Sequence, residues 1–179
     1  MNRQIAIVED EPALQSNYRE ALERSGYSVD VYSNRPDAID AFRQRLPELA
    51  IIDVGLGPEI EGGFELCREL RSMAPALPIM FLTARDSELD TISGLRLGAD
   101  DYMTKDISLE HLVARVVALF RRVDAFKQPL LPEDVIDVGE ISINLQRMTA
   151  TWKSQAVPLT VTELWMTHAL VKHLSLIHI

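Results

Sequence analysis

Four short apolar runs, each followed at once by polar residues, constrain the fold of this chain more than any other feature. Stretches with the periodicity of helices separate the runs, a pattern typical of buried strands in a parallel sheet. Ligands of such sheets bind beyond the carboxyl ends of the strands. The polar side chains at these ends should therefore share one edge of the sheet. The runs are Ile5–Val8, Leu49–Ile52, Pro78–Leu82 and Tyr102–Thr104, and the polar residues are Glu9, Asp10, Asp53, Thr83 and Lys105.

The stretches between the strands predict helices. Apolar residues recur at helical spacing, for example at Ala38 and Phe42 of the second stretch. Leu66, Leu70 and Met73 should share one face of the third helix. Together with a shorter strand, these repeats predict an α/β fold, a doubly wound sheet of five parallel strands. The helices are expected at about 12–25, 35–45, 64–73, 87–97 and 109–126, and the shorter strand at 28–32.

The length of 179 residues suits one domain of roughly 120 residues and a smaller unit. Residues 1–126 make up the first domain. Residues 127–134 include two prolines and predict a linker.

The pattern of residues 135–173 differs from that of the first domain. Short alternating segments predict strands, and the capping box from Thr160 to Glu163 should open a helix that ends at about His173. One helix and a small sheet bury a poor core, so we expect this unit to be incomplete. The expected strand segments are 136–144, 148–153 and 156–159.

Residues 174–179 (Leu-Ser-Leu-Ile-His-Ile) continue no pattern. They match the translation of a transposon-end adapter used in sequencing libraries, so we expect a sequencing artefact at this end. The alternative is a short apolar C-terminus.

The composition excludes some classes of function. A net charge of −9 does not favour a general affinity for nucleic acid. The single cysteine, Cys67, cannot form an internal disulfide, which favours a reducing compartment. No apolar stretch approaches the roughly 18–20 residues that span a bilayer. The N-terminus enters the first strand without room for a signal peptide. We expect a cytoplasmic protein with no membrane partner.

The acids at the strand ends predict a site for a divalent cation and a phosphoryl group. Asp10 and Asp53 offer hard oxygens of the kind that hold Mg²⁺, and Glu9 can contribute through a bound water. The backbone carbonyl of Gly55 supplies a further oxygen. Mg²⁺ lowers the repulsion between an anionic phosphoryl donor and the attacking Asp53 carboxylate. The Thr83 hydroxyl and the Lys105 ammonium would bind the transferred phosphoryl oxygens.

Each of these residues has an ordinary alternative role. Glu9 and Asp10 could cap the following helix, and Thr83 could cap a later one. Asp53 could be a loop acid and Lys105 a solvated surface charge. All five residues, however, have chemistry that suits a cation and a phosphoryl group, and all are expected at one edge of the sheet. This conjunction favours the site over the separate ordinary roles.

The first 122 residues resemble the receiver domain of bacterial two-component response regulators, which has a flavodoxin-like fold. The resemblance implies that a sensor histidine kinase phosphorylates Asp53 and that Glu9 and Asp10 hold Mg²⁺. It also implies that Thr83 and Tyr102 form a switch pair and that Lys105 binds the phosphoryl group. The segments that carry it are Val8–Pro12, Ile52–Val54, Leu82–Arg85 and Gly98–Lys105.

The second unit resembles the N-terminal sheet and first helix of the winged-helix domain in OmpR-type regulators, most recognisably at Leu159–Glu163. Within that subfamily, the chain most resembles the response regulators of proteobacterial dedicated sortase systems. The intact protein would then bind promoter DNA and control transcription. DNA binding is not expected for this chain, which carries no recognition helix.

The OmpR-type resemblance also implies a homodimer on phosphorylation, formed through the fourth helix, the fifth strand and the fifth helix. An apolar patch and charged pairs across the dyad would hold it, although exposed pairs contribute only about 0–1 kcal/mol each. Thr91 and His111 stand where relatives often have Arg and Glu, so one bridge is missing. The expected dimer face comprises Ile92, Leu95 and Val113, with Asp100 or Asp101 opposite Arg115 or Arg122.

Two departures from the family pattern stand out. Asp106 follows Lys105 where the family has a proline, typically in a cis peptide. A non-proline cis bond costs about 2.5–4 kcal/mol, so we expect a trans bond. The loop after Asp53 is roughly two residues longer than usual, which predicts an altered lifetime of the phosphoryl group.

Two other functions compete with a phosphorylation-switched regulator. A haloacid-dehalogenase-type phosphatase or phosphotransferase uses similar residues on a similar sheet, but needs a second acid two residues after its nucleophile. Gly55 holds that position here, so we expect no enzyme of this type. A stand-alone receiver that acts by protein contact is the other alternative.

Overall fold

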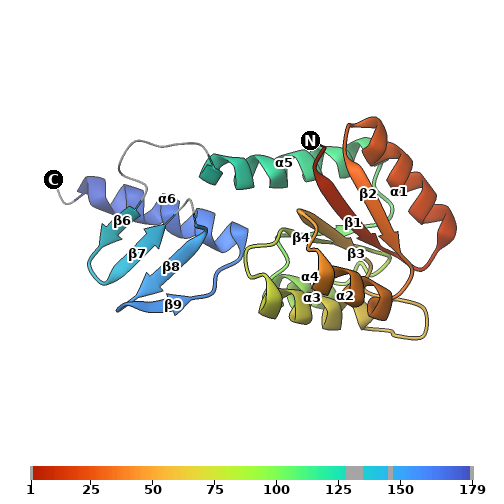
Figure 1. The fold of residues 1–179 in the computed structure, drawn as a ribbon, viewed down its shortest axis with the longest axis horizontal. Coiled ribbons are helices and arrows are strands. Elements are labelled where there is room, and N and C mark those ends of the chain that lie inside the picture. The colour runs from red at the N-terminus through yellow and green to blue at the C-terminus, as the bar shows by residue number, and fades with distance from the viewer. Residues whose placement is uncertain (1, 128–134, 145–146, 178–179) are drawn as a thin grey trace.

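The computed structural model describes residues 2–127, 135–144 and 147–177. The N-terminal unit alternates strands and helices as the sequence predicts (Figure 1). A smaller unit of strands and one helix follows it. The N-terminal elements are β1 (Gln4–Val8), α1 (Pro12–Arg24), β2 (Ser28–Tyr32), α2 (Arg35–Gln44), β3 (Leu49–Ile52), α3 (Gly62–Met73), β4 (Ile79–Thr83), α4 (Glu88–Arg96), β5 (Asp101–Thr104) and α5 (Leu109–Lys127). The later elements are β6 (Val135–Val138), β7 (Ile141–Asn144), β8 (Thr149–Trp152), β9 (Gln155–Val157) and α6 (Val161–Ile177).

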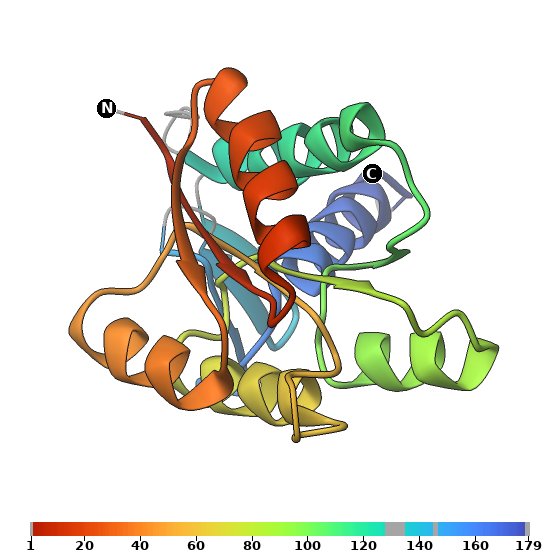
Figure 2. The same cartoon turned by 90° about the vertical axis from the view of Figure 1, so that its right-hand side faces the viewer.

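The first five strands form a parallel sheet in the order β2-β1-β3-β4-β5, and helices cover both of its faces (Figure 2). Successive side chains of a strand point to opposite faces. Ile5 and Ile7 accordingly pack with α1 and α5, whereas Ala6 and Val8 pack with α2 and α3. The doubly wound fold predicted from the sequence is confirmed.

Two local expectations have clear outcomes. Leu66 and Leu70 of α3 are buried as expected, but Met73 is 38% exposed. Met73 is the last residue of α3, and the backbone leaves the helix at Ala74. The Lys105–Asp106 bond is trans, since no cis peptide occurs in the described ranges.

The smaller unit is an antiparallel sheet in the order β6-β7-β8-β9 with α6 packed against it. The segment expected as strand-like at 136–144 divides into two strands at Gly139, whose φ of 61° makes a turn. The capping box is confirmed, because the Thr160 amide donates to Glu163 Oε2 (2.9 Å) and the Glu163 amide donates to Thr160 Oγ1 (3.3 Å). Helix α6 continues to Ile177, beyond the expected end. All but the first residue of the expected linker 127–134, and residues 178–179 of the expected artefact, lie outside the described residues.

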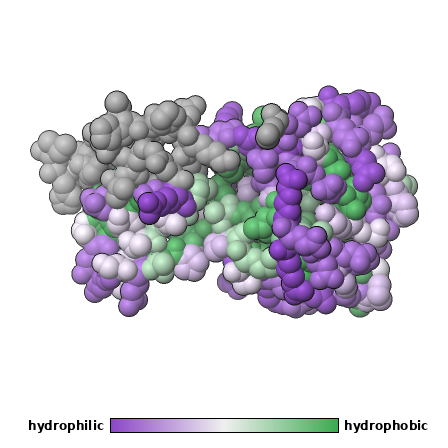
Figure 3. Space-filling model, viewed as in Figure 1, coloured by the Kyte–Doolittle hydropathy of each residue, from purple (hydrophilic) through white to green (hydrophobic). Residues whose placement is uncertain are grey.

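The two units meet through apolar residues (Figure 3). Val123 of α5 packs into the core of the second unit. Leu77 and Pro78 line a cavity together with Met148 and Leu159. In the part of the chain that the structure describes, no helix has the length and apolarity needed to cross a bilayer.

Candidate functional site

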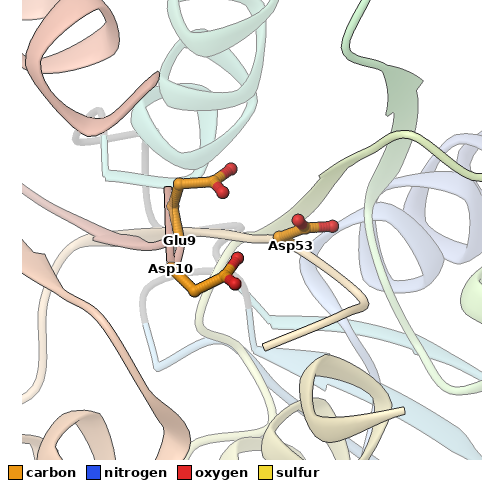
Figure 4. Close-up of side chains that lie close together, drawn as sticks. All are labelled: Glu9, Asp10 and Asp53. Carbon is orange, nitrogen blue, oxygen red and sulfur yellow. The ribbon is translucent and has the colours of Figure 1, made fainter. Parts of the chain in front are cut away.

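Three carboxylates converge at the carboxyl edge of the parallel sheet. β1 and β3 are neighbours, with Val8 paired to Ile52, so the residues that follow them are adjacent. The Asp53 amide donates to the Val8 carbonyl (2.9 Å), which fixes this register. One oxygen from each of Glu9, Asp10 and Asp53 lies within 4.8 Å of the others (Figure 4). The structure therefore brings together the acids that the sequence places at the two strand ends.

Lys105 joins two of these acids. It follows β5, and its Nζ lies 2.5 Å from Asp53 Oδ2 and 2.7 Å from Glu9 Oε2. Burial alone would lower the pKa of Lys105, but its bonds to Asp53 and Glu9 outweigh this effect and raise that pKa. Burial raises the pKa of Glu9, opposed by its bonds to Lys105 and to the Glu11 amide. One ammonium thus offsets only part of the negative charge that the three acids bring to this edge.

Asp10 differs from the other two acids because it is exposed. Its Oδ2 accepts a hydrogen bond from the Gly57 amide (3.1 Å), and no cationic side chain in the described ranges pairs with it. The sequence indicates a long loop that contains Gly57, but it does not indicate the hydrogen bond from Gly57 to Asp10. Gly55 lies in the same loop, two residues after Asp53. An exposed acid beside two buried ones is a donor set that suits a hard cation.

Thr83 ends β4 at the same edge and is buried. Its carbonyl accepts from the Lys105 amide (2.9 Å), and its hydroxyl accepts from the Arg85 amide (3.4 Å). The Tyr102 hydroxyl donates to the Arg85 carbonyl (3.1 Å). Burial raises the pKa of Tyr102 to about 12, so this phenol remains a donor at neutral pH. The Arg85 backbone therefore links Thr83 to Tyr102, which the sequence predicts as a switch pair.

The expected dimer face needs correction at Asp100. The Asp100 side chain is fully buried, pairs with Arg71 (2.9 Å) and accepts bonds from the Ile79 amide and from Thr162. A carboxylate enclosed in this way cannot reach across a dyad. The Arg122 guanidinium, also expected at the dimer face, donates a hydrogen bond to the Thr162 hydroxyl of the same chain (3.3 Å).

Other residues of that face lie where a partner could reach them. Ile92 and Leu95 of α4 are 41% and 47% exposed. Asp101 pairs with Arg115 within the chain (3.4 Å). Val113 is only partly buried and packs against the core beneath α1 and α5.

Comparisons with known proteins agree with this geometry. A profile described as the response regulator receiver domain matches residues 5–117. The transcriptional regulatory protein CreB of Escherichia coli (strain K12) is 39% identical over 166 residues, which cover 93% of this chain and 70% of CreB. The activated receiver domain of Klebsiella pneumoniae RstA is 30% identical, with a TM-score of 0.62 over 66% of this chain and 99% of that domain. DrrB of Thermotoga maritima, an OmpR/PhoB homologue, shares the fold at 24% identity, with a TM-score of 0.63 over 97% of this chain and 74% of DrrB.

Proposed function

The chain belongs to the two-component response regulators of the OmpR/PhoB type, and from this membership we propose that it signals by accepting a phosphoryl group on Asp53. Receiver domains of this type interact with histidine kinases, bind Mg²⁺ at an acidic pocket and dimerise. The observation that carries the proposal is the convergence of Lys105 with the carboxylates of Glu9, Asp10 and Asp53 at one edge of the sheet.

In this proposal Asp10 and Asp53 would hold Mg²⁺, and Glu9, through a bound water, and the Gly55 carbonyl would contribute further oxygens. The cation supplies positive charge that offsets the repulsion between the acidic edge and an anionic donor. An oxygen of the Asp53 carboxylate attacks the phosphorus, the bond to the donor breaks, and the leaving group carries away the bonding electron pair. The new bond is an acyl phosphate on Asp53.

Lys105 and Thr83 exchange partners when this bond forms. Lys105 already touches Asp53 Oδ2 and is held by Glu9, so its ammonium can move to a phosphoryl oxygen without leaving the site. The Thr83 hydroxyl now only accepts from the Arg85 amide and can donate to another phosphoryl oxygen. That movement would pull on the backbone of Arg85, to which Tyr102 is bonded. Thr83 and Tyr102 are thus proposed as the switch pair.

Acetyl phosphate and Mg²⁺, followed by intact-mass spectrometry, test the proposal. The wild-type chain should gain one phosphoryl group, and Asp53→Asn should gain none. Asp40→Asn is the control, because Asp40 is an exposed acid of α2 that lies outside both the cluster and the expected dimer face, and it should be labelled like the wild type. An adduct that persists in Asp53→Asn would refute the assignment.

The rest of the regulator is proposed by extension from the relatives. We assign residues 1–126 to the receiver, 127–134 to a linker and 135–173 to the first part of a winged-helix domain, with 174–179 as an artefact. Transcriptional control and promoter binding are proposed for a regulator of the length of CreB, 70% of which the aligned part of this chain covers. A dimer through Ile92 and Leu95 remains part of the proposal. The narrower assignment to a sortase system stays a prediction.

The longer loop after Asp53 supports a further part of the proposal, an altered lifetime of the phosphoryl group. If the labelled chain released phosphate at the rate of an ordinary receiver, the altered lifetime would be contradicted, and the rest of the proposal would be unaffected.

A further inference from the structure

The loop between β3 and α3 is built as a tight, fixed turn. The Leu56 amide donates to the Glu59 carbonyl (3.0 Å) and the Glu59 amide donates back to the Leu56 carbonyl (3.1 Å). Leu56 is buried in the core below α2 and α3. Gly57 between them has a φ of 60°, a conformation that glycine adopts without strain. These bonds and the burial of Leu56 set the shape of the turn itself.

Two arginines from other elements hold this loop from outside. Arg35, at the start of α2, places its guanidinium 2.7 Å from Glu59 and also 2.7 Å from Glu69 of α3. Arg85, after β4, donates to the Ile60 carbonyl (3.0 Å). The loop is thus tied to α2 and to the segment after Thr83.

The turn directs one backbone donor at the acidic edge. The Gly57 amide donates to Asp10 Oδ2 at 3.1 Å. Asp10 is exposed, so without this bond its side chain would be free to rotate. A carboxylate accepts several partners at once, which leaves oxygen lone pairs of Asp10 available to a cation. Hydrogen bonds to a ligating carboxylate fix its orientation and strengthen metal binding.

We propose that the β3–α3 loop positions Asp10 for Mg²⁺ through the Gly57 amide, and that the Arg35–Glu59 ion pair keeps the loop in place. This inference rests on the proposed function, because it assumes that the acidic edge holds Mg²⁺. Gly57 is a positioning residue in this account, and Glu59 acts one step further from the cation. The longer loop, which departs from the family pattern, thereby acquires a role in metal affinity.

Glu59 and Glu69 provide a matched pair of variants. Both bind the same Arg35, both side chains are about one-third exposed, at 36% and 35%, and both lose one negative charge on substitution by alanine. Only Glu59 belongs to the loop. Glu59→Ala should release the loop, whereas Glu69→Ala should leave it attached.

Titration of each chain with Mg²⁺ by calorimetry measures the effect on metal affinity, and hydrogen exchange at the Gly57 amide reports how firmly the loop is held. Because loss of a direct partner of a ligand typically costs 10–100-fold in affinity, we expect about three- to tenfold weaker binding in Glu59→Ala, one step further away. Exchange at Gly57 should accelerate in that variant, and Glu69→Ala should match the wild type in both measurements.

Equal Mg²⁺ affinity in Glu59→Ala and the wild type would overturn the inference. Equal weakening in both variants would also overturn it, because charge rather than the loop would then be responsible. A wild-type chain that binds no Mg²⁺ would instead refute the proposed function itself, so the two failures are distinguishable.

Discussion

The carboxylate of Asp100 accepts hydrogen bonds from both the backbone amide (2.9 Å) and the hydroxyl (2.8 Å) of Thr162, although 62 residues separate the two in the sequence. Thr162 lies in the first turn of α6, where backbone amides lack helical partners and the helix dipole favours a negative charge. Asp100 of the receiver thus caps a helix of the second unit. The contact joins the two units by a charged group as well as by apolar packing.

Thr162→Val should weaken this contact. The change removes the hydroxyl bonds to Asp100 and Arg122, and a hydrogen bond to a charged group contributes about 1.5–3 kcal/mol. We expect faster hydrogen exchange at the first amides of α6. Thr167→Val is the control, because among the described residues the Thr167 hydroxyl donates within α6, to the Glu163 carbonyl. Identical exchange in the two variants would contradict a role for the Asp100 contact.

The neighbouring acids Asp100 and Asp101 should differ sharply in their effect on stability. Asp100→Ala leaves the mostly buried Arg71 without its carboxylate and should cost about 3–5 kcal/mol in the free energy of unfolding. Asp101→Ala loses a more exposed pair with Arg115 and should cost about 0–1 kcal/mol. Urea denaturation of both variants measures the difference. Similar losses of unfolding free energy in the two variants would show that burial does not increase the contribution of Asp100 to stability.

The stability that Lys105 provides should depend on pH in a defined direction. The bonds to Asp53 and Glu9 raise its pKa in the folded chain, so its stabilising contribution is complete below its unfolded pKa of about 10.5 and is lost as the pH rises through the folded pKa. The difference in unfolding free energy between the wild type and Lys105→Met should be constant from pH 8 to 10 and shrink above that range. Urea denaturation at each pH measures it. A difference that grows with pH would contradict the ion pairs seen here.

Cys67 should be unreactive in the folded chain. It is fully buried on α3, and burial raises the pKa of its thiol to about 11. Ellman's reagent at pH 8 should therefore give no rapid colour with native protein and one equivalent after denaturation in urea. Rapid reaction of the native protein would mean that α3 is not packed as described.

The acidic edge could be predicted from the sequence because it depends on strand ends alone. Apolar runs locate the strands, and parallel geometry brings residues such as Asp10, Asp53 and Lys105 to one edge. The buried faces of α1, α2 and α5 follow from helical periodicity in the same way.

The remaining contacts depend on the conformation of loops and on the docking of the two units, which local sequence patterns do not determine. The bond from Gly57 to Asp10 requires the particular turn of a loop with few apolar residues. The burial of Asp100 depends on the docking of a second unit more than 60 residues away. The sequence therefore could not show that Asp100, one of the two acids expected at the dimer face, is buried, because its partners Arg71 and Thr162 are remote in sequence.

Borohydride reduction after acetyl phosphate treatment, followed by peptide mapping, locates an acyl phosphate at a single residue. If Asp53 accepts the phosphoryl group with the help of Mg²⁺, reduction should convert Asp53, and no other acid, to homoserine, and EDTA should abolish the conversion by removing Mg²⁺. Conversion at another acid, or conversion at Asp53 that is unaffected by EDTA, would contradict this role of Asp53 and Mg²⁺.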